Sequence, residues 1–181
     1  KDFLDRADIL CSLGQTVLIS NYQEYYKLIE YFSRYTKKRM GVIMGGNAMM
    51  DLFNERYYRE LNGGILEAFG IMFSRDLKVY AYPWHDAAND VLIRTDNAPI
   101  HPRIKPLYDY LLFNKRITDI HLDDLSLLDI FSAEVLRMIR SGETGWEEMV
   151  PQEVDNIIKR SRLFGYAGPT PTAGSGLTDA A

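Results

Sequence analysis

Residues that build disulfides and metal sites are scarce in this sequence. Cys11 is the only cysteine among 181 residues, so no disulfide can form within the chain. The three histidines, His85, His101 and His121, lack the i, i+3 or i, i+4 spacing of a helical metal site. The sequence therefore predicts no protein-bound metal. The single thiol fits the cytoplasm or another reducing soluble compartment, such as an organelle matrix.

Long apolar runs and an excess of basic charge are also missing. No stretch approaches the roughly 20 apolar residues that cross a membrane, and no signal peptide is visible. The formal net charge is −4, and the basic run at residues 37–39 is short. We interpret that run as a solvated turn. Because the electrostatic footprint of a nucleic-acid-binding protein is absent, we expect neither a membrane span nor a nucleic-acid partner.

The residues that are present alternate between two patterns. Continuous apolar and β-branched runs at residues 16–20, 40–44 and 78–82 are typical of strands buried on both faces. Helical periodicity covers residues 22–35, 47–61 and 65–73. This order, with right-handed crossovers, predicts an α/β fold that is Rossmann-like, with a mainly parallel sheet and helices on both faces.

The second half of the chain is predicted to be more helical. Residues 84–102 are polar and contain prolines, which predicts a long loop with a short strand at 91–94. A helix at 104–114, a strand at 117–120 and helices at 131–140 and 151–162 complete a single α/β domain over residues 1–166. From residue 167 the composition changes to Gly, Pro, Thr, Ser and Ala. We expect the tail at 167–181 to be disordered or bound to a partner.

Two predicted strand ends are candidate binding sites, because ligands of doubly wound sheets bind at the carboxyl ends of strands. Ser20 and Asn21 follow the first strand, and Asn21 is a candidate helix cap. Gly45, Gly46 and Asn47 follow the second strand. Glycines allow a ligand close to the backbone, and a helix N-terminus offers free N–H groups to a phosphate or a sugar hydroxyl. The alternative is a tight turn in which Asn47 is the N-cap.

Tyrosine is abundant, with 12 residues, and several lie on the predicted helices. Aromatic side chains with a polar tip suit half-buried faces and interfaces. Packing within the fold, or against a protein partner or a second copy of the chain, is therefore the favoured role for them.

The C-terminal segment resembles the end of the nicotinate and nicotinamide mononucleotide adenylyltransferases. In that family a Ser-Ser/Gly-Thr-x-x-Arg turn opens a helix that grips the phosphates of ATP, and an aromatic-x-x-Leu-Val-Pro segment follows. The matching residues here are Ser132, Arg137, Trp146, Met149, Val150, Pro151, Val154 and Ile158. The resemblance implies that Ser132 and Arg137 contact phosphate, that ATP and a pyridine mononucleotide are substrates with Mg²⁺ as the ion, and that the role is in NAD biosynthesis. Residues 16–166 are also similar to soluble bacterial proteins often labelled "TonB-dependent receptor".

The chain departs from the family at the residues that carry the chemistry. The family has a pair of histidines after its first strand, whereas this chain has no histidine before His85. Glu134 occupies a position where a hydroxyl is expected, and it would place a carboxylate against a phosphate. Two hypotheses follow. The chain is a nucleotidyltransferase-like domain whose histidine motif lies upstream, or it is a non-catalytic nucleotide-binding or assembly subunit of a larger complex.

The chemistry favours the second hypothesis for this chain, so we predict no catalytic residue. The predicted binding residues are Ser20, Asn21, Gly45, Gly46, Asn47, Ser132 and Arg137.

Overall fold

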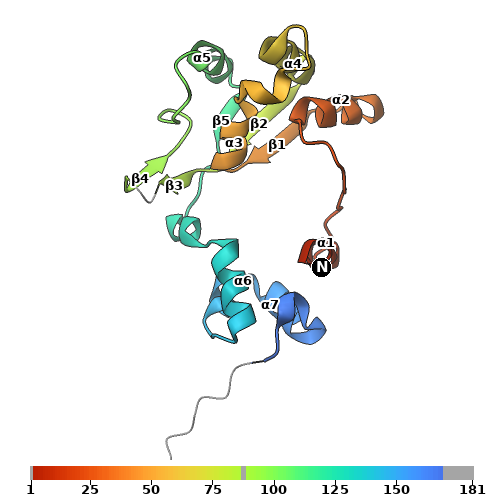
Figure 1. The fold of residues 1–181 in the computed structure, drawn as a ribbon, viewed down its shortest axis with the longest axis vertical. Helices are drawn as coiled ribbons and strands as arrows, with labels where there is room; N and C mark the ends of the chain where they lie inside the picture. The colour runs from red at the N-terminus through yellow and green to blue at the C-terminus, as the bar shows by residue number, and fades with distance from the viewer. Residues whose placement is uncertain (1, 87–88, 169–181) are drawn as a thin grey trace, which may run out of the picture. The chain divides into compact units, whose positions relative to one another are not determined.

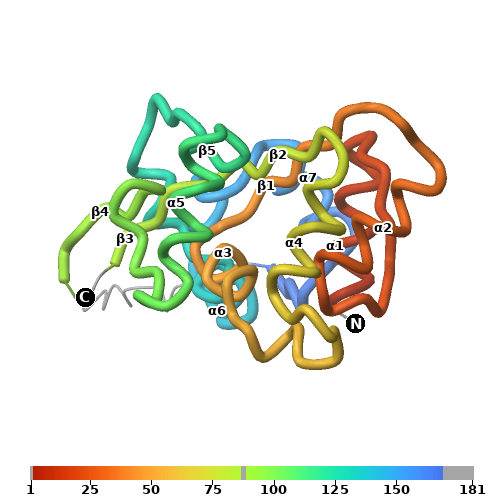
Figure 2. Tube along the Cα trace, turned by 90° about the horizontal axis from the view of Figure 1, so that it is seen from above, coloured from red at the N-terminus to blue at the C-terminus, as the bar shows by residue number. Residues whose placement is uncertain are grey.

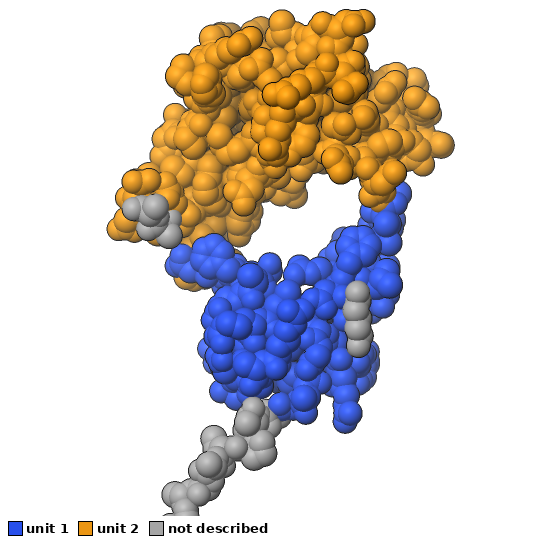
Figure 3. Space-filling model, viewed as in Figure 1, with its two compact units in different colours: residues 1–19, 129–181 blue, residues 20–128 orange. Residues whose placement is uncertain are grey.

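The chain divides into two compact units. The computed structural model describes residues 2–86 and 89–168. Unit 1 consists of Lys1–Ile19 and Asp129–Ala181, and unit 2 of Ser20–Leu128, coloured blue and orange in Figure 3. The sequence suggests one domain over residues 1–166, and the described residues of that span are shared between the two units. The predicted tail lies outside the described residues apart from Ala167 and Gly168.

Unit 2 is built on a parallel sheet (Figures 1 and 2). Its strands are β1 (Met40–Met44), β2 (Leu77–Ala81) and β5 (Ile117–Asp119), in the order β1-β2-β5. Met40 pairs with Leu77, and Val79 pairs with Ile117. The apolar runs at 40–44 and 78–82 predicted β1 and β2, the separate prediction of a strand at 117–120 covers β5, and the α/β class is confirmed.

Helices of unit 2 pack on this sheet and on one another. They are α2 (Tyr25–Tyr35), α3 (Gly46–Leu52), α4 (Gly64–Phe73) and α5 (Lys105–Phe113), with the 3₁₀ turn η1 (Glu55–Tyr58); a second 3₁₀ turn, η2 (Leu125–Asp129), ends at the first residue of the second segment of unit 1. α2 packs against α4, α3 against β1 and α5 against β5. The helix predicted over residues 47–61 ends at Leu52. The chain turns into η1 because the Asn54 side chain accepts a hydrogen bond from the Arg56 N–H, at 3.2 Å.

Within unit 2 the sheet is buried on one face, which corrects the prediction of helices on both faces. Leu77, Val79 and Ala81 of β2 are each 1% exposed and belong to the core. On the opposite face, Ile43 of β1 is 70% exposed, and Lys78 of β2 is half-buried. Successive strand residues point to opposite faces, so the helices of unit 2 cover only one of them.

The long predicted loop contains an antiparallel hairpin. It is formed by β3 (Trp84–Asp86) and β4 (Val91–Ile93), of which only the second was predicted. Thr95 connects the loop to the sheet, since its N–H and hydroxyl both donate to the Asp119 carboxylate, at 2.9 and 2.8 Å. The buried Tyr108 hydroxyl donates to the Thr95 carbonyl at 2.8 Å.

The strand predicted at residues 16–20 does not form. Leu18 and Ile19 are 53% and 58% exposed, and the segment has no regular structure. An apolar run becomes a strand only when another strand supplies hydrogen bonds, and in the described residues β1 pairs with β2 alone.

Unit 1 is helical and has its own core. Its elements are α1 (Asp2–Ser12), α6 (Ser132–Ser141) and α7 (Gln152–Ser161), with 3₁₀ turns η3 (Trp146–Met149) and η4 (Leu163–Gly165). The buried core residues are Ile9, Val135, Ile139, Trp146, Ile158 and Phe164. The sequence predicted α6 and α7 but not α1. None of the described helices is long and apolar enough to cross a membrane.

Candidate functional site

The predicted binding residues fall into two groups. Ser20, Asn21, Gly45, Gly46 and Asn47 belong to unit 2, and Ser132 and Arg137 belong to unit 1. In unit 2, Ser20 and Asn21 are exposed and precede α2, whose N-cap is Glu24 rather than Asn21.

The turn between β1 and α3 is shaped by packing. Its N-cap is Gly45, not Asn47 as one interpretation of the sequence proposes, and α3 begins at the buried Gly46. A Cβ atom at Gly46 would lie 2.3 Å from Cδ2 of Trp84, far inside van der Waals contact. The missing side chain therefore makes room for the Trp84 indole, which fills the space beside Gly46.

On α6, the guanidinium of Arg137 is held by two carboxylates. Its Nε and Nη2 atoms donate to Glu134 at 2.9 and 2.7 Å. Its Nη1 and Nη2 atoms donate to Glu143 at 2.5 and 2.9 Å. These bonds raise the pKa of Arg137. Its hydrogen bonds, together with one from Ser141, lower the pKa of Glu143 to about 2. A phosphate could bind Arg137 only by displacing a carboxylate that is already in bidentate contact.

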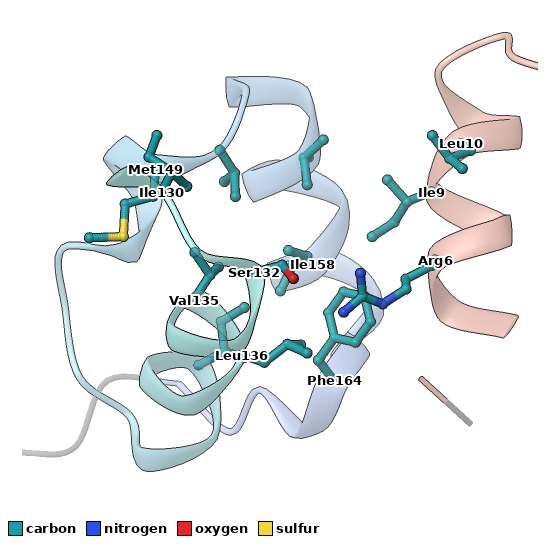
Figure 4. Close-up of a pocket in the computed structure, with 13 residues that line it drawn as sticks. Arg6, Ile9, Leu10, Ile130, Ser132, Val135, Leu136, Met149, Ile158 and Phe164 are labelled. Carbon is teal, nitrogen blue, oxygen red and sulfur yellow. The ribbon is translucent and has the colours of Figure 1, made fainter. Parts of the chain in front are cut away.

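Unit 1 also contains an apolar cavity of about 380 Å³, between α1 and the helices α6 and α7 (Figure 4). It is lined by Arg6, Ile9, Leu10, Ile130, Ser132, Val135, Leu136, Ile139, Met149, Val150, Val154, Ile158 and Phe164. Two of these thirteen side chains, Arg6 and Ser132, are polar. The cavity thus contains one of the predicted site residues, in surroundings that are otherwise hydrophobic.

Helical spacing explains how the sequence forms this lining. Val135 and Ile139 are one turn apart on α6, and Val154 and Ile158 are one turn apart on α7, so each pair presents one apolar face. α1 closes the third side. It is fixed to unit 1 by the buried Asp5, whose carboxylate accepts a hydrogen bond from the Phe164 N–H at 3.3 Å.

A second contact fixes α1 at its first residue. Asp2 forms an ion pair with Arg140 of α6. With the Asp5 contact, it places the next residues of α1 at the cavity, Arg6 among them.

Among the described residues of the lining, only Arg6 is charged. Its side chain extends from α1 toward Phe164 in Figure 4, and it is exposed to solvent. Among the residues described, no ion pair or hydrogen bond engages its guanidinium. The hydroxyl of Ser132, at the first position of α6, is likewise free within the described residues. The cavity therefore offers a cation and a hydroxyl beside a large apolar surface.

Sequence reasoning missed Arg6 because it did not predict α1. The available signal was weak: Ile9, three residues after Arg6, is the one buried apolar residue of that helix. Neither of the two units contains, within its described residues, a group of three or more His, Cys, Asp or Glu side chains that could hold a metal ion.

Comparison of the chain with protein-family models, curated proteins and solved structures found no match.

Proposed function

We propose that the chain is a non-catalytic binding module whose helical unit takes a small carboxylate with an apolar body. The observation that carries this proposal is the cavity of about 380 Å³, in which the guanidinium of Arg6, without a partner among the described residues, faces a largely aliphatic lining. Its volume falls in the range of ligand pockets, roughly 300–1,000 Å³.

The lining favours an apolar ligand body. Eleven of its side chains are aliphatic, aromatic or methionine, and two of them, Ile139 and Ile158, are 1% and 2% exposed. Apolar surface transferred from water to such a site contributes about 25 cal/mol per Å². A polar ligand body would lose its hydration against these eleven side chains without gaining hydrogen bonds.

The charge of the cavity favours a carboxylate as the polar end. Arg6 can donate two parallel hydrogen bonds to a carboxylate, a geometry that an amine or an alcohol cannot use. The Ser132 hydroxyl, at the start of α6, can donate a further bond. The first N–H groups of a helix favour negative charge as well.

The proposal includes descent from the pyridine mononucleotide adenylyltransferases, with unit 2 as a Rossmann-like parallel sheet that its own helices cover on one face. Parallel strands in the order β1-β2-β5, joined by crossovers that contain helices, support that relationship. The clamp of Glu134 and Glu143 on Arg137 supports the non-catalytic reading, since the residue expected on phosphate is already paired.

Calorimetric titration of the intact chain with octanoate and with octanol tests the proposal. We expect octanoate to bind more tightly than octanol. Arg6→Gln should weaken octanoate binding about three- to tenfold and leave octanol unchanged, because one charge-assisted contact is lost. Arg160→Gln, which removes an exposed charge of α7 outside the lining, is the matched control.

Titration with ATP and with nicotinamide mononucleotide tests the adenylyltransferase prediction in the same experiment. Micromolar binding of either nucleotide that disappears in Arg137→Ala would favour that prediction over an apolar ligand. Absence of octanoate binding at millimolar concentration would contradict our proposal.

A further inference from the structure

Three loops of unit 2 bring basic residues to one edge of the sheet. Because β1, β2 and β5 are parallel, the segments that lead into them lie at the same, amino-terminal edge. These segments and the strand starts contain seven basic residues: Lys37, Lys38, Arg39, Arg75, Lys78, Lys115 and Arg116. Within the same segments, Asp76 is the single acidic residue.

The positive charge of this edge differs from the charge balance of unit 2 as a whole. Residues 20–128 contain fourteen basic and fourteen acidic residues, so unit 2 has no formal net charge. Half of its basic residues nevertheless lie at this edge. Such a concentration raises the local potential and attracts anions, even though the protein as a whole is acidic.

The edge contains a groove of about 390 Å³. It is lined by Arg39, Asp76, Leu77, Lys78, Asn114, Lys115 and Arg116. Asp76 positions two of the cations, since its carboxylate accepts from Arg39 Nε at 2.6 Å and lies 3.7 Å from Arg116 Nη1. Arg116 also donates to the Leu77 carbonyl at 3.4 Å.

Two lysines of the groove have no carboxylate partner among the described residues. The Lys78 ammonium lies 5.2 Å from the centre of the Tyr80 ring, and no ion pair engages Lys78 or Lys115 in the part of the chain that the structure describes. With Arg39 and Arg116 they give four cations to one carboxylate around the groove.

We propose that this groove binds a small anion with two or more phosphate groups. Cations from the loops before β1 and β5 and from the start of β2 surround it, which suits an anion whose charge is spread over several oxygens. None of the described lining residues is aromatic, so they offer no platform on which a nucleobase could stack. The site lies in unit 2, at the edge opposite the strand ends, and is independent of the carboxylate proposed for unit 1.

Titration of the intact chain with inorganic triphosphate at low ionic strength tests this site. We expect saturable binding that added salt weakens. Lys78→Gln and Lys115→Asn should each weaken it about two- to fivefold, as expected for exposed charge pairs. Asparagine is chosen at position 115 because Lys115 has a φ of 54°, which asparagine tolerates. Arg59→Gln, outside the groove, should have no effect.

Titrations with ATP, duplex DNA and anionic lipid vesicles show whether the groove prefers a small polyphosphate to these other anions. ATP should bind no more tightly than inorganic triphosphate, since the base gains no contact. The proposal is overturned if triphosphate does not bind at millimolar concentration, or if Arg59→Gln weakens it as much as the two lysine variants do. Binding of duplex DNA or anionic lipid vesicles in the absence of triphosphate binding would also overturn it.

Discussion

Gly46 and Trp84 form a contact that leaves no space for a methyl group. The atom added by Gly46→Ala would lie 2.3 Å from the indole, so the ring or the start of α3 has to move. We expect this variant to lose about 1–3 kcal/mol of unfolding free energy, as overpacked sites do. Urea unfolding followed by Trp84 fluorescence in a Trp146→Phe background measures the loss.

Gly45→Ala is the matched control for this prediction. A Cβ atom there meets nothing within 4 Å, and Gly45 has a φ of −79° that alanine adopts readily. Its unfolding free energy should be unchanged or slightly higher. Equal losses in the two variants would indicate that the turn needs glycine for backbone freedom, rather than to accommodate the indole.

The clamp on Arg137 makes the stability of unit 1 depend on pH. Bonds from Arg137 and Ser141 lower the pKa of Glu143 from 4.5 to about 2 in the folded chain. A depressed carboxyl pKa stabilises the fold above the unfolded value, and this stabilisation is lost as the pH falls from about 4.5 to about 2. Glu143→Gln should reduce that loss.

Urea midpoints recorded across this pH range, with Trp146 fluorescence as the signal for unit 1, measure the effect. Glu148→Gln removes an exposed carboxylate that has no ion pair in the described chain, and it should leave the profile of the parent unchanged. If the urea midpoints of Glu143→Gln fell with pH as much as those of the parent, the contact between Glu143 and Arg137 would not be the source of the pH dependence.

At the level of elements, the attachment of α1 to the rest of unit 1 depends on Asp5. This carboxylate is 7% exposed and accepts the Phe164 N–H, which is 159 residues away in the chain. Asp5→Ala leaves that buried N–H without its acceptor and should cost about 1–3 kcal/mol in the unfolding of unit 1. Asp8→Ala, on the exposed side of α1, should cost little. Similar losses in both variants, measured through Trp146, would show that Asp5 does not fix α1.

Elements with a local signal could be predicted from the sequence. The apolar runs of β1 and β2 and the periodic apolar residues of α6 and α7 identify those elements without further information. Residues 16–20 have the same strand composition, but they remain exposed because pairing depends on a neighbouring strand. α1 was missed because its buried face includes Asp5, whose partner lies near the other end of the sequence.

At the scale of the whole molecule, net charge conceals how charge is distributed. Residues of unit 1 include eleven acidic and seven basic side chains, whereas unit 2 is balanced. The basic run at 37–39 looks like an isolated turn in the sequence. The parallel sheet places it beside two further basic loops. A groove of this kind depends on topology, so composition alone could not predict it.

The candidate cavity was predictable only in part, for the same reason. Ser132 was identified from its motif, and the structure places it in the cavity lining. Arg137 was identified from the same motif, but its guanidinium forms ion pairs with Glu134 and Glu143. Arg6, which no described residue engages, contributes the cation from a helix far away in the sequence. The apolar residues of unit 1 determine how its helices pack, whereas Arg6, Ser132 and Arg137 determine which ligand groups the unit could bind.

The most direct test of the proposed function is the ratio of the octanol and octanoate dissociation constants, measured for the intact chain and for Arg6→Gln. Our account predicts a ratio well above one in the parent chain that falls about three- to tenfold in Arg6→Gln, while Arg160→Gln retains the parent value. An equal ratio in all three proteins, or no binding of either ligand, would contradict a carboxylate site at Arg6.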